Sequence, residues 1–252
     1  MARFRIIGDF DPFLRADVEI RDSIICERDS MVMMDDNLAL EAIATGGVGK
    51  ALLRAFGSSQ GFFQERISAV GGNGMCLLSP PFNGGIYLLN VGPAQYAIND
   101  RCFLACQNTV RIDAQLQKNI IGGLLGGTGG LLIGVATGRG DLAVCGSGKL
   151  LTVEVAPDNP LTIDAGHVVA WDNSLSYQLS LSLGKKKSSV LSKMINSVTS
   201  GEGLTLNFQG SGLVIVSTRK PTPRSGAGGD GGDSTDDWDG GDGDFGGDGG
   251  GD

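Results

Sequence analysis

KNIIGGLLGGTGGLLIGVATGRGDLAVCGS, residues 118–147, is the stretch that decides the fold, because its pattern occurs three times in the chain. An earlier copy occupies residues 50–79, and a later copy occupies residues 192–218. Each copy has an apolar lead-in, a glycine, an apolar run, a Gly-x-Gly turn and a second apolar run. A pattern that recurs at such a spacing indicates a repeat architecture, in which stacked units share one core.

A segment with the alternation of β-strands precedes each copy, at residues 18–44, 89–115 and 153–182. Apolar and polar residues alternate there as they do along a half-buried strand. Each unit is too small and too rich in glycine to bury a good core alone, so we expect it to stack against its neighbours. A closed arrangement of three units would also protect the sheet edges that an open array exposes.

Two of the lead-ins have the three- and four-residue spacing of apolar residues that is typical of amphipathic helices. They are VGKALLRAF at residues 48–56 and SSVLSKMIN at residues 188–196. We therefore predict a mainly β fold with three internal repeats in a pseudo-threefold arrangement, accompanied by short helices. The glycines of the Gly-x-Gly turns, and Asn73 in the first of them, are predicted to adopt positive φ.

The composition changes abruptly after Arg219, which divides the chain into residues 1–219 and residues 220–252. Residues 225–252 contain 13 glycines, nine aspartates and no lysine or arginine. The nine aspartates contribute a charge of −9 to the net charge of −8, so residues 1–224 have a net charge of +1. Low hydrophobicity and charge of one sign predict a disordered acidic tail behind a nearly neutral triple-repeat β domain. The tail is expected either to solubilise the chain or to contact a basic partner.

An odd number of cysteines without a secretion signal indicates a reducing compartment, so a cytoplasmic location is expected. All are expected to be free and most to be buried thiols. The five residues are Cys26, Cys76, Cys102, Cys106 and Cys145.

Residues 120–136 form the one uncharged run that is long enough for a membrane-spanning helix. Seven of its 17 residues are glycine. Each glycine in a helix interior costs about 0.8–1 kcal/mol relative to alanine. A spanning helix is therefore not expected.

His167 is the only histidine of the chain. Metal sites need several converging ligands, and a nucleophile pair with Cys or Ser would have to use this same histidine. We therefore expect a strand histidine held by hydrogen bonds, and we predict no catalytic residue, metal ligand or cofactor. The glycine runs lack the other elements of phosphate loops and dinucleotide motifs, so they are expected to allow close backbone packing.

Lys185, Lys186 and Lys187 form the main basic cluster. A solvated turn explains such a run, because charged residues at a turn remain in water. The alternative is a contact to anionic lipid or phosphate, to which each cation contributes about 1 kcal/mol near a membrane surface.

Three stretches together resemble one known family. They are GVGKALLRAFGSSQGFFQ at residues 47–64, IDAGHVVAWDNSLSYQL at residues 163–179 and SGEGLTLNFQGSGLVIVSTR at residues 200–219. Over about residues 3–219 the chain is similar to the family of altered inheritance of mitochondria protein 24. The resemblance implies a fold like the tryptophan RNA-binding attenuation protein, a short double-stranded β-helix repeated three times. It marks Gly166, His167 and Asp172 as structural residues of the family motif.

The resemblance ties eukaryotic members of the family to mitochondrial inner-membrane organisation, so a mitochondrial location is the alternative to a cytoplasmic one. Repeats supply surface rather than chemistry, so we predict a non-enzymatic scaffold or binding protein. We expect a homo-oligomer that binds protein partners and contacts a membrane or a larger complex at its surface. The alternative is a module that binds RNA or a small ligand between repeats. The nearly neutral domain argues against nucleic acid.

Overall fold

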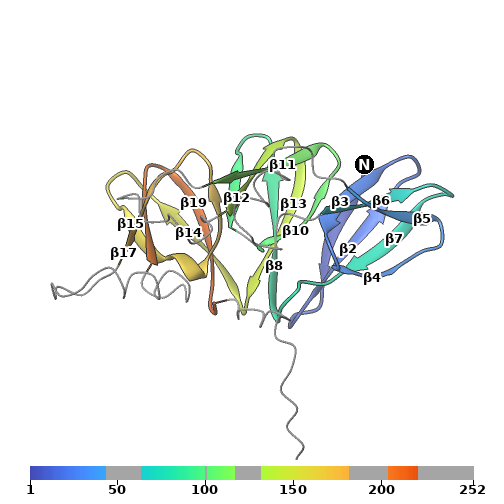
Figure 1. Ribbon diagram of the computed structural model, residues 1–252, viewed down its shortest axis with the longest axis horizontal. Helices are drawn as coiled ribbons and strands as arrows, with labels where there is room; N and C mark the ends of the chain where they lie inside the picture. The colour runs from blue at the N-terminus through green and yellow to red at the C-terminus, as the bar shows by residue number, and fades with distance from the viewer. Residues whose placement is uncertain (44–63, 100, 117–131, 182–203, 221–252) are drawn as a thin grey trace, which may run out of the picture. The chain divides into compact units, whose positions relative to one another are not determined.

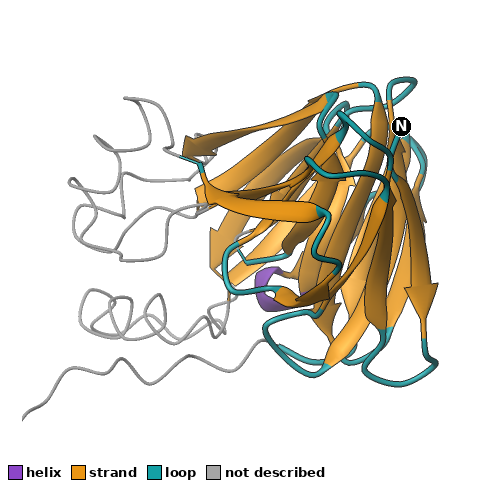
Figure 2. Ribbon diagram, turned by 90° about the vertical axis from the view of Figure 1, so that its right-hand side faces the viewer, coloured by secondary structure: helices purple, strands orange, loops and turns teal. Residues whose placement is uncertain are grey.

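The computed structural model describes residues 1–43, 64–99, 101–116, 132–181 and 204–220. Strands make up almost all of the regular structure in these residues. Figure 2 shows them together with one helical turn of 3-10 geometry, η1 (Ala165–His167). The prediction of a mainly β fold is confirmed. The helices predicted at residues 48–56 and 188–196 lie outside the described residues.

One N-terminal strand, β1 (Arg3–Ile7), precedes three groups of six strands, which we call repeats 1, 2 and 3 (Figure 1). Repeat 1 consists of β2 (Phe13–Val18), β3 (Ser23–Glu27), β4 (Met31–Met34), β5 (Leu38–Ala42), β6 (Gln64–Ala69) and β7 (Gly74–Leu78). Repeat 2 consists of β8 (Gly84–Val91), β9 (Tyr96–Asn99), β10 (Phe103–Gln107), β11 (Val110–Leu116), β12 (Leu132–Gly138) and β13 (Gly140–Ser147). Repeat 3 consists of β14 (Leu150–Val155), β15 (Leu161–Asp164), β16 (Val168–Asp172), β17 (Ser176–Leu181), β18 (Leu204–Gln209) and β19 (Gly212–Ser217).

Each repeat pairs its strands in the same order. The first, sixth and third strands lie side by side, and so do the fourth, fifth and second strands. In repeat 2, for example, the two sets are β8–β13–β10 and β11–β12–β9. Each set therefore joins strands from the beginning, the middle and the end of a repeat.

Backbone pairing joins neighbouring repeats. β3 of repeat 1 pairs antiparallel with β10 of repeat 2, with Ile25 opposite Cys106. β9 of repeat 2 pairs in the same way with β16 of repeat 3, with Ala97 opposite Trp171. At each junction the second strand of one repeat meets the third strand of the next, and two three-stranded sets become one six-stranded sheet.

A β-bulge shows which residues of the three repeats are equivalent. The ladder between the third and the sixth strand skips one residue of the third strand in every repeat. The skipped residue is Val32 in repeat 1, Leu104 in repeat 2 and Val169 in repeat 3. Because a bulge shifts the register by one residue, counting from these three residues relates each nearby position to its counterparts.

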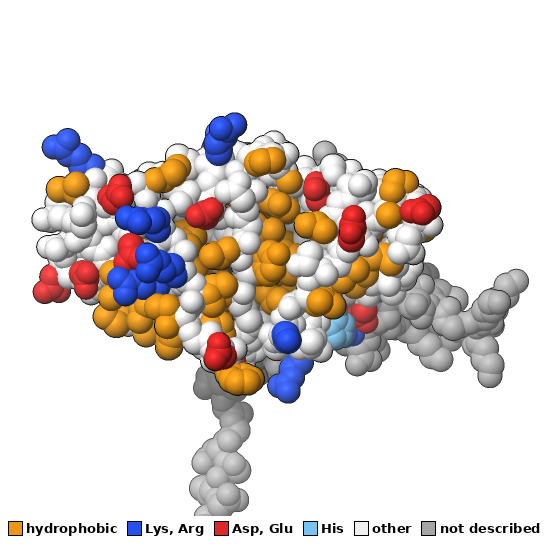
Figure 3. Space-filling model, turned by 180° about the vertical axis from the view of Figure 1, so that it is seen from behind, with side chains coloured by type: hydrophobic (Ala, Val, Ile, Leu, Met, Phe, Trp, Pro, Cys, Tyr) orange, Lys and Arg blue, Asp and Glu red, His pale blue; other side chains and the backbone are white. Residues whose placement is uncertain are grey.

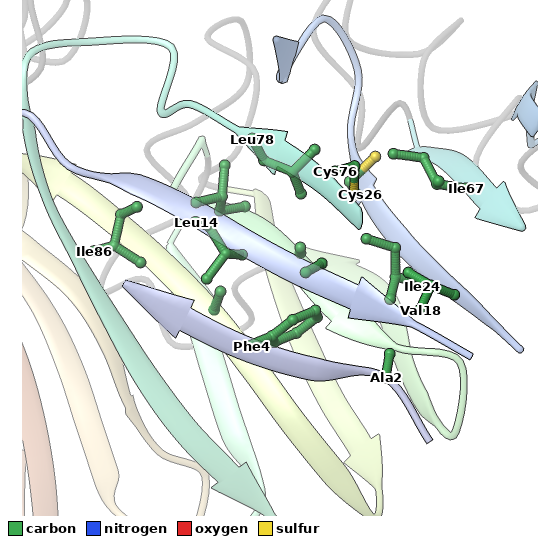
Figure 4. Packing of buried hydrophobic residues seen from close by; sticks show 14 of the residues in the cluster. Ala2, Phe4, Leu14, Val18, Ile24, Cys26, Ile67, Cys76, Leu78 and Ile86 are labelled. Carbon is green, nitrogen blue, oxygen red and sulfur yellow. The ribbon is translucent and has the colours of Figure 1, made fainter. Parts of the chain in front are cut away.

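The hydrophobic core extends across the junctions. Leu104 and Ala105 of repeat 2 are fully buried in one cluster with Leu14, Ile24 and Leu78 of repeat 1. Figure 4 shows residues of this cluster, which come from different strands and point toward one another. The second cluster likewise combines residues of repeats 2 and 3. Each repeat therefore completes its core with side chains of its neighbour.

Part of the long uncharged run is a strand. Residues 132–136 belong to β12, which pairs with β11 on one side and with β9 on the other. In the part of the chain that the structure describes, no helix is long and apolar enough to cross a membrane.

The Gly-x-Gly turns connect the fifth strand of each repeat to the sixth. Their first glycines, Gly72, Gly138 and Gly210, have φ angles of 156°, 99° and 114°. At Gly138 a Cβ atom would also collide with the carbonyl oxygen of Thr109. The predicted positive φ is confirmed at these three positions, where an L side chain would be strained. The prediction is wrong for Asn73, whose φ is not positive.

All five cysteines are free and buried, as predicted. Burial raises the pKa of the Cys26 and Cys76 thiols to about 12. Burial also raises the pKa of Cys106 and of Cys145. These thiols are therefore uncharged at neutral pH and are core side chains.

The described residues 1–220 belong to one compact unit, which the division of the chain ends at Pro221. The boundary that we predict from composition lies at residues 219–220. Residues 221–252, which include nearly all of the predicted acidic tail, lie outside the described residues.

A leucine at a junction tests the shared core. We expect Leu104→Ala to lower the free energy of unfolding by about 2–5 kcal/mol, because it leaves a cavity between two repeats. Leu151→Ala is the matched control: Leu151 is 62% exposed, whereas Leu104 is 0% exposed. Urea unfolding measures both variants, and an equal, small loss in the two would contradict a core that spans the junction.

The buried thiols predict that stability falls at alkaline pH. An unfolded thiol has a pKa of about 8.5, whereas burial raises the pKa of Cys26 and Cys76 to about 12. Above the unfolded pKa the unfolded chain loses protons that the folded chain keeps. The free energy of unfolding then falls by about 1.4 kcal/mol per pH unit for each such thiol. Denaturant unfolding at a series of pH values measures this slope, and Cys76→Ala should make it shallower. An unchanged slope in the variant would show that the Cys76 thiol does not cause the loss of stability.

Candidate functional site

The turn between β15 and β16 contains two of the three family-motif residues. Asp164 ends β15, and its Oδ1 accepts a hydrogen bond of 2.9 Å from the backbone N–H of Gly166. Its Oδ2 accepts a hydrogen bond of 2.9 Å from Nζ of Lys220. A Cβ atom on Gly166 would lie 3.0 Å from Cδ of Lys220, so glycine leaves room for the lysine stem. The carboxylate thus caps η1 and also holds the segment that follows β19.

His167 is bound to the backbone of β19. Its Nδ1 lies 2.8 Å from the carbonyl oxygen of Ser217. A carbonyl oxygen only accepts hydrogen bonds, so Nδ1 is the donor in this contact. The Ser217 hydroxyl lies 3.3 Å from the carbonyl oxygen of His167 and 2.9 Å from that of Arg219. The imidazole therefore orients the ends of two paired strands.

Asp172, the third family-motif residue, lies in a different turn. Its Oδ1 accepts a hydrogen bond of 2.9 Å from the backbone N–H of Ser174, and its carbonyl oxygen accepts one of 3.0 Å from Leu175. A Cβ atom on Gly212 would lie 2.9 Å from Cβ of Asp172, so this turn packs closely on the start of β19. Such side-chain-to-backbone bonds stabilise a turn. The motif therefore supports two separate turns and does not converge on one site.

An open hollow of about 570 Å³ lies beside η1. Its walls come from β14, β15 and β19, and it is lined by Val153, Leu161, Thr162, Ile163, Asp164, His167, Val216, Ser217 and Thr218. Apolar side chains from all three strands form much of the lining. Figure 3 shows the histidine at the surface, close to hydrophobic and charged side chains. A hollow with apolar walls and few polar groups is suited to apolar side chains or to a small ligand.

No pattern in the sequence predicts this hollow, because its walls come from separate strands. Leu161 and Ile163 alternate with Thr162, which predicts a strand. Val216 and Ser217 come from the last strand of the repeat and reach the site only through sheet pairing. The alternation along β15 was the available signal, but it does not show that one edge of this strand is open.

The other residues that we considered for chemistry do not add to this site. Lys185, Lys186 and Lys187 lie outside the described residues. Among the residues that are described, no group of three His, Cys, Asp or Glu side chains is placed to hold a metal ion.

A pair of substitutions tests what His167 does. His167→Gln keeps a donor for the Ser217 carbonyl, whereas His167→Leu removes it. We expect the leucine variant to unfold about 1 kcal/mol more easily than the glutamine variant, because a lost hydrogen bond typically costs this much. Urea unfolding measures the difference, and equal stabilities would show that the bond between Nδ1 and the Ser217 carbonyl contributes nothing.

Comparisons with known proteins agree with the motifs. Residues 4–219 match the family described as mitochondrial biogenesis AIM24. An uncharacterized protein of Streptococcus pyogenes serotype M6 is 31% identical over 215 residues, which cover 82% of this chain and 81% of that protein. The crystal structure of a Streptococcus pyogenes protein has a TM-score of 0.68 and 27% identity, covering 87% of this chain and 94% of the other. The chain therefore belongs to the mitochondrial biogenesis AIM24 family, the family that its repeated motifs resemble.

Proposed function

We propose that this protein is a non-enzymatic scaffold that associates with copies of itself and with protein partners. The observation that carries the proposal is the sharing of sheets between repeats, through β3 with β10 and β9 with β16. Repeats that add to one another through backbone pairing build extended surfaces, which is the usual role of repeat proteins. The fold by itself does not specify chemistry.

The arrangement that fits this role is a short double-stranded β-helix repeated three times, as in the tryptophan RNA-binding attenuation protein. The identical pairing order in the three repeats supports it. A pseudo-threefold arrangement of the repeats is part of the proposal, although β4 and β15 each end a sheet in the described residues of one chain.

The state of the reactive side chains supports a role without catalysis. The five thiols are buried, and burial raises the pKa of four of them: Cys26, Cys76, Cys106 and Cys145. A nucleophilic cysteine needs a lowered pKa and access to solvent. The Nδ1 proton of His167 is engaged by a backbone carbonyl. Packing and strand alignment account for these groups.

A cytoplasmic location fits the free thiols, because cytosolic thiols stay reduced. The family description offers a mitochondrial location as the alternative. Contact with an anionic membrane surface or a larger complex would involve Lys185, Lys186 and Lys187, which together supply three positive charges.

The second candidate function is the binding of a small ligand between strands. The observation that favours it is the hollow of about 570 Å³ beside β15, which is within the size of ligand sites. RNA is the weaker ligand class, because residues 1–224 carry a net charge of only +1 and phosphate neutralisation dominates RNA affinity.

Cross-linking in the native host tests the scaffold proposal. The full chain and a chain ending at Arg224 serve as paired baits. We expect both to recover the same protein partners, because the β domain provides the surface. Partners that bind the full chain and disappear with the shorter one would instead place recognition in the acidic segment. The absence of any partner for either bait would contradict the scaffold and favour the small-ligand function.

A further inference from the structure

The strands that join the repeats are buried wherever a neighbouring repeat covers them. On the third strands β10 and β16, the bulge residues Leu104 and Val169 are 0% and 1% exposed. On the second strands β3 and β9, Ile24 and Ile98 are both 0% exposed. These positions are apolar because they face a second repeat and not water.

The two remaining strands of these kinds, β4 and β15, also carry apolar side chains, but each lies at the end of its sheet. Each has one strand partner in the described part of the chain. On β4, Val32 is 51% and Met33 is 44% exposed, although their counterparts in repeats 2 and 3 are buried. On β15, Leu161 and Ile163 are only partly buried. A sheet edge with apolar side chains and unpaired backbone groups is a template for another strand.

We propose that β4 of one chain pairs antiparallel with β15 of a second copy of the same chain. The contact repeats the inner junctions, in which a second strand meets a third strand. Counting along equivalent positions gives its register. The three expected Cα pairs are Met33–Ile163, Met34–Thr162 and Asp35–Leu161.

The hollow beside β15 is the place where this second copy fits. Four of its apolar lining residues have counterparts in repeat 2, at equivalent places on β8, β9 and β13. These counterparts are Leu89, Tyr96, Ile98 and Val144, and all four are buried. They form one cluster with Val169 and Ala170 of repeat 3, so the neighbouring repeat fills the corresponding space at the inner junction.

Val32 and Met33 are the counterparts of Val169 and Ala170. They would therefore enter the hollow of the second copy and lose their exposure to water. Burial of apolar side chains at both edges provides the driving force. The hollow and the exposed strand are two halves of one interface, located at opposite ends of the series of shared sheets.

The polar contact at this interface differs from that at the inner junction. Nδ2 of Asn99 donates hydrogen bonds to the carbonyl oxygens of Ala165 and Val168 in the next repeat. Asp164 has the place of Asn99 in repeat 3, and a carboxylate cannot donate. Its partner Lys220 carries the donor group at this edge. The association is therefore expected to depend more on apolar packing and backbone pairing than on this polar group.

This contact is head-to-tail, because the two chains contribute different strands. Such a contact forms a ring where its rotation closes and a filament where it does not. The inference rests on the proposed self-association, and it assigns that association to a surface and a register.

A charge on the exposed strand tests the surface. We expect the full chain to exceed its monomer mass of 26.0 kDa in light scattering at increasing concentration. Val32→Asp should raise the dissociation constant more than about tenfold, because it would bury an unpaired charge. Since Val32 is exposed within one chain, the variant should remain folded by circular dichroism. Phe10→Asp is the control: Phe10 is 94% exposed between β1 and β2, and its variant should associate like the unchanged chain.

Mixed disulfides test the register independently. A chain with Met33→Cys is mixed with a chain carrying Ile163→Cys, and the native cysteines are all buried. Directly opposite residues lie within the Cα separation that a disulfide requires, whereas residues two positions away do not. We expect a cross-linked dimer from this mixture, and far less from Met33→Cys mixed with Leu161→Cys.

The outcomes separate this interface from self-association in general. If Val32→Asp does not weaken the association and the mixed disulfide does not form, the proposed interface is wrong, although the chain still self-associates. A chain that stays at 26.0 kDa at every concentration overturns self-association as well. A third chain carries both Met33→Cys and Ile163→Cys. If it forms only an internal disulfide, β4 and β15 pair within one chain, and the proposed contact with a second copy is wrong.

Discussion

The antiparallel ladder between neighbouring repeats is the contact on which the rest of the structure depends. β3 with β10 and β9 with β16 each convert two small sets of strands into one six-stranded sheet. Every cluster of the described core contains residues of at least two repeats. A single repeat would leave much of its apolar surface in water, so the stability of each repeat includes the contact with its neighbour. For the same reason, a sheet edge with exposed apolar side chains is expected to bind a further repeat.

The junction also explains why thiols lie in this core. Cys26 and Cys106 belong to the two paired strands of the first junction, where Cys26 faces Ala105 and Cys106 faces Ile25. Small apolar side chains are suited to such positions, because two layers of side chains share a limited space. Burial then raises the pKa of both thiols. Their high pKa is a consequence of packing, and no special chemistry is needed to account for it.

Much of the fold could be predicted from the spacing of motifs, but the order of pairing could not. The recurrence of glycines and alternating runs located three units of strands. Nothing in that pattern shows that the third strand of a unit pairs with its sixth strand, because this pairing depends on long-range closure. The alignment of individual positions also needs the structure. Asp29 and Arg101 share positive φ angles of 61° and 66°, and each lies three residues before a bulge residue, Val32 or Leu104. A pattern of apolar runs does not reveal such an equivalence.

The contacts of the candidate site could not be predicted either. His167 contacts a carbonyl oxygen 50 residues further along the chain, and only the pairing of strands brings the two groups together. The ends of the repeat series nevertheless had a signal in the sequence. β1 pairs with β2 and covers one edge of the first sheet, which leaves β4 as its other edge. That edge reads MVMM, without the charge, proline or polar residue that usually protects an edge strand. Repeat arrays that end in solution have polar terminal surfaces. An apolar terminal strand is expected instead in a chain whose series of sheets continues into another chain.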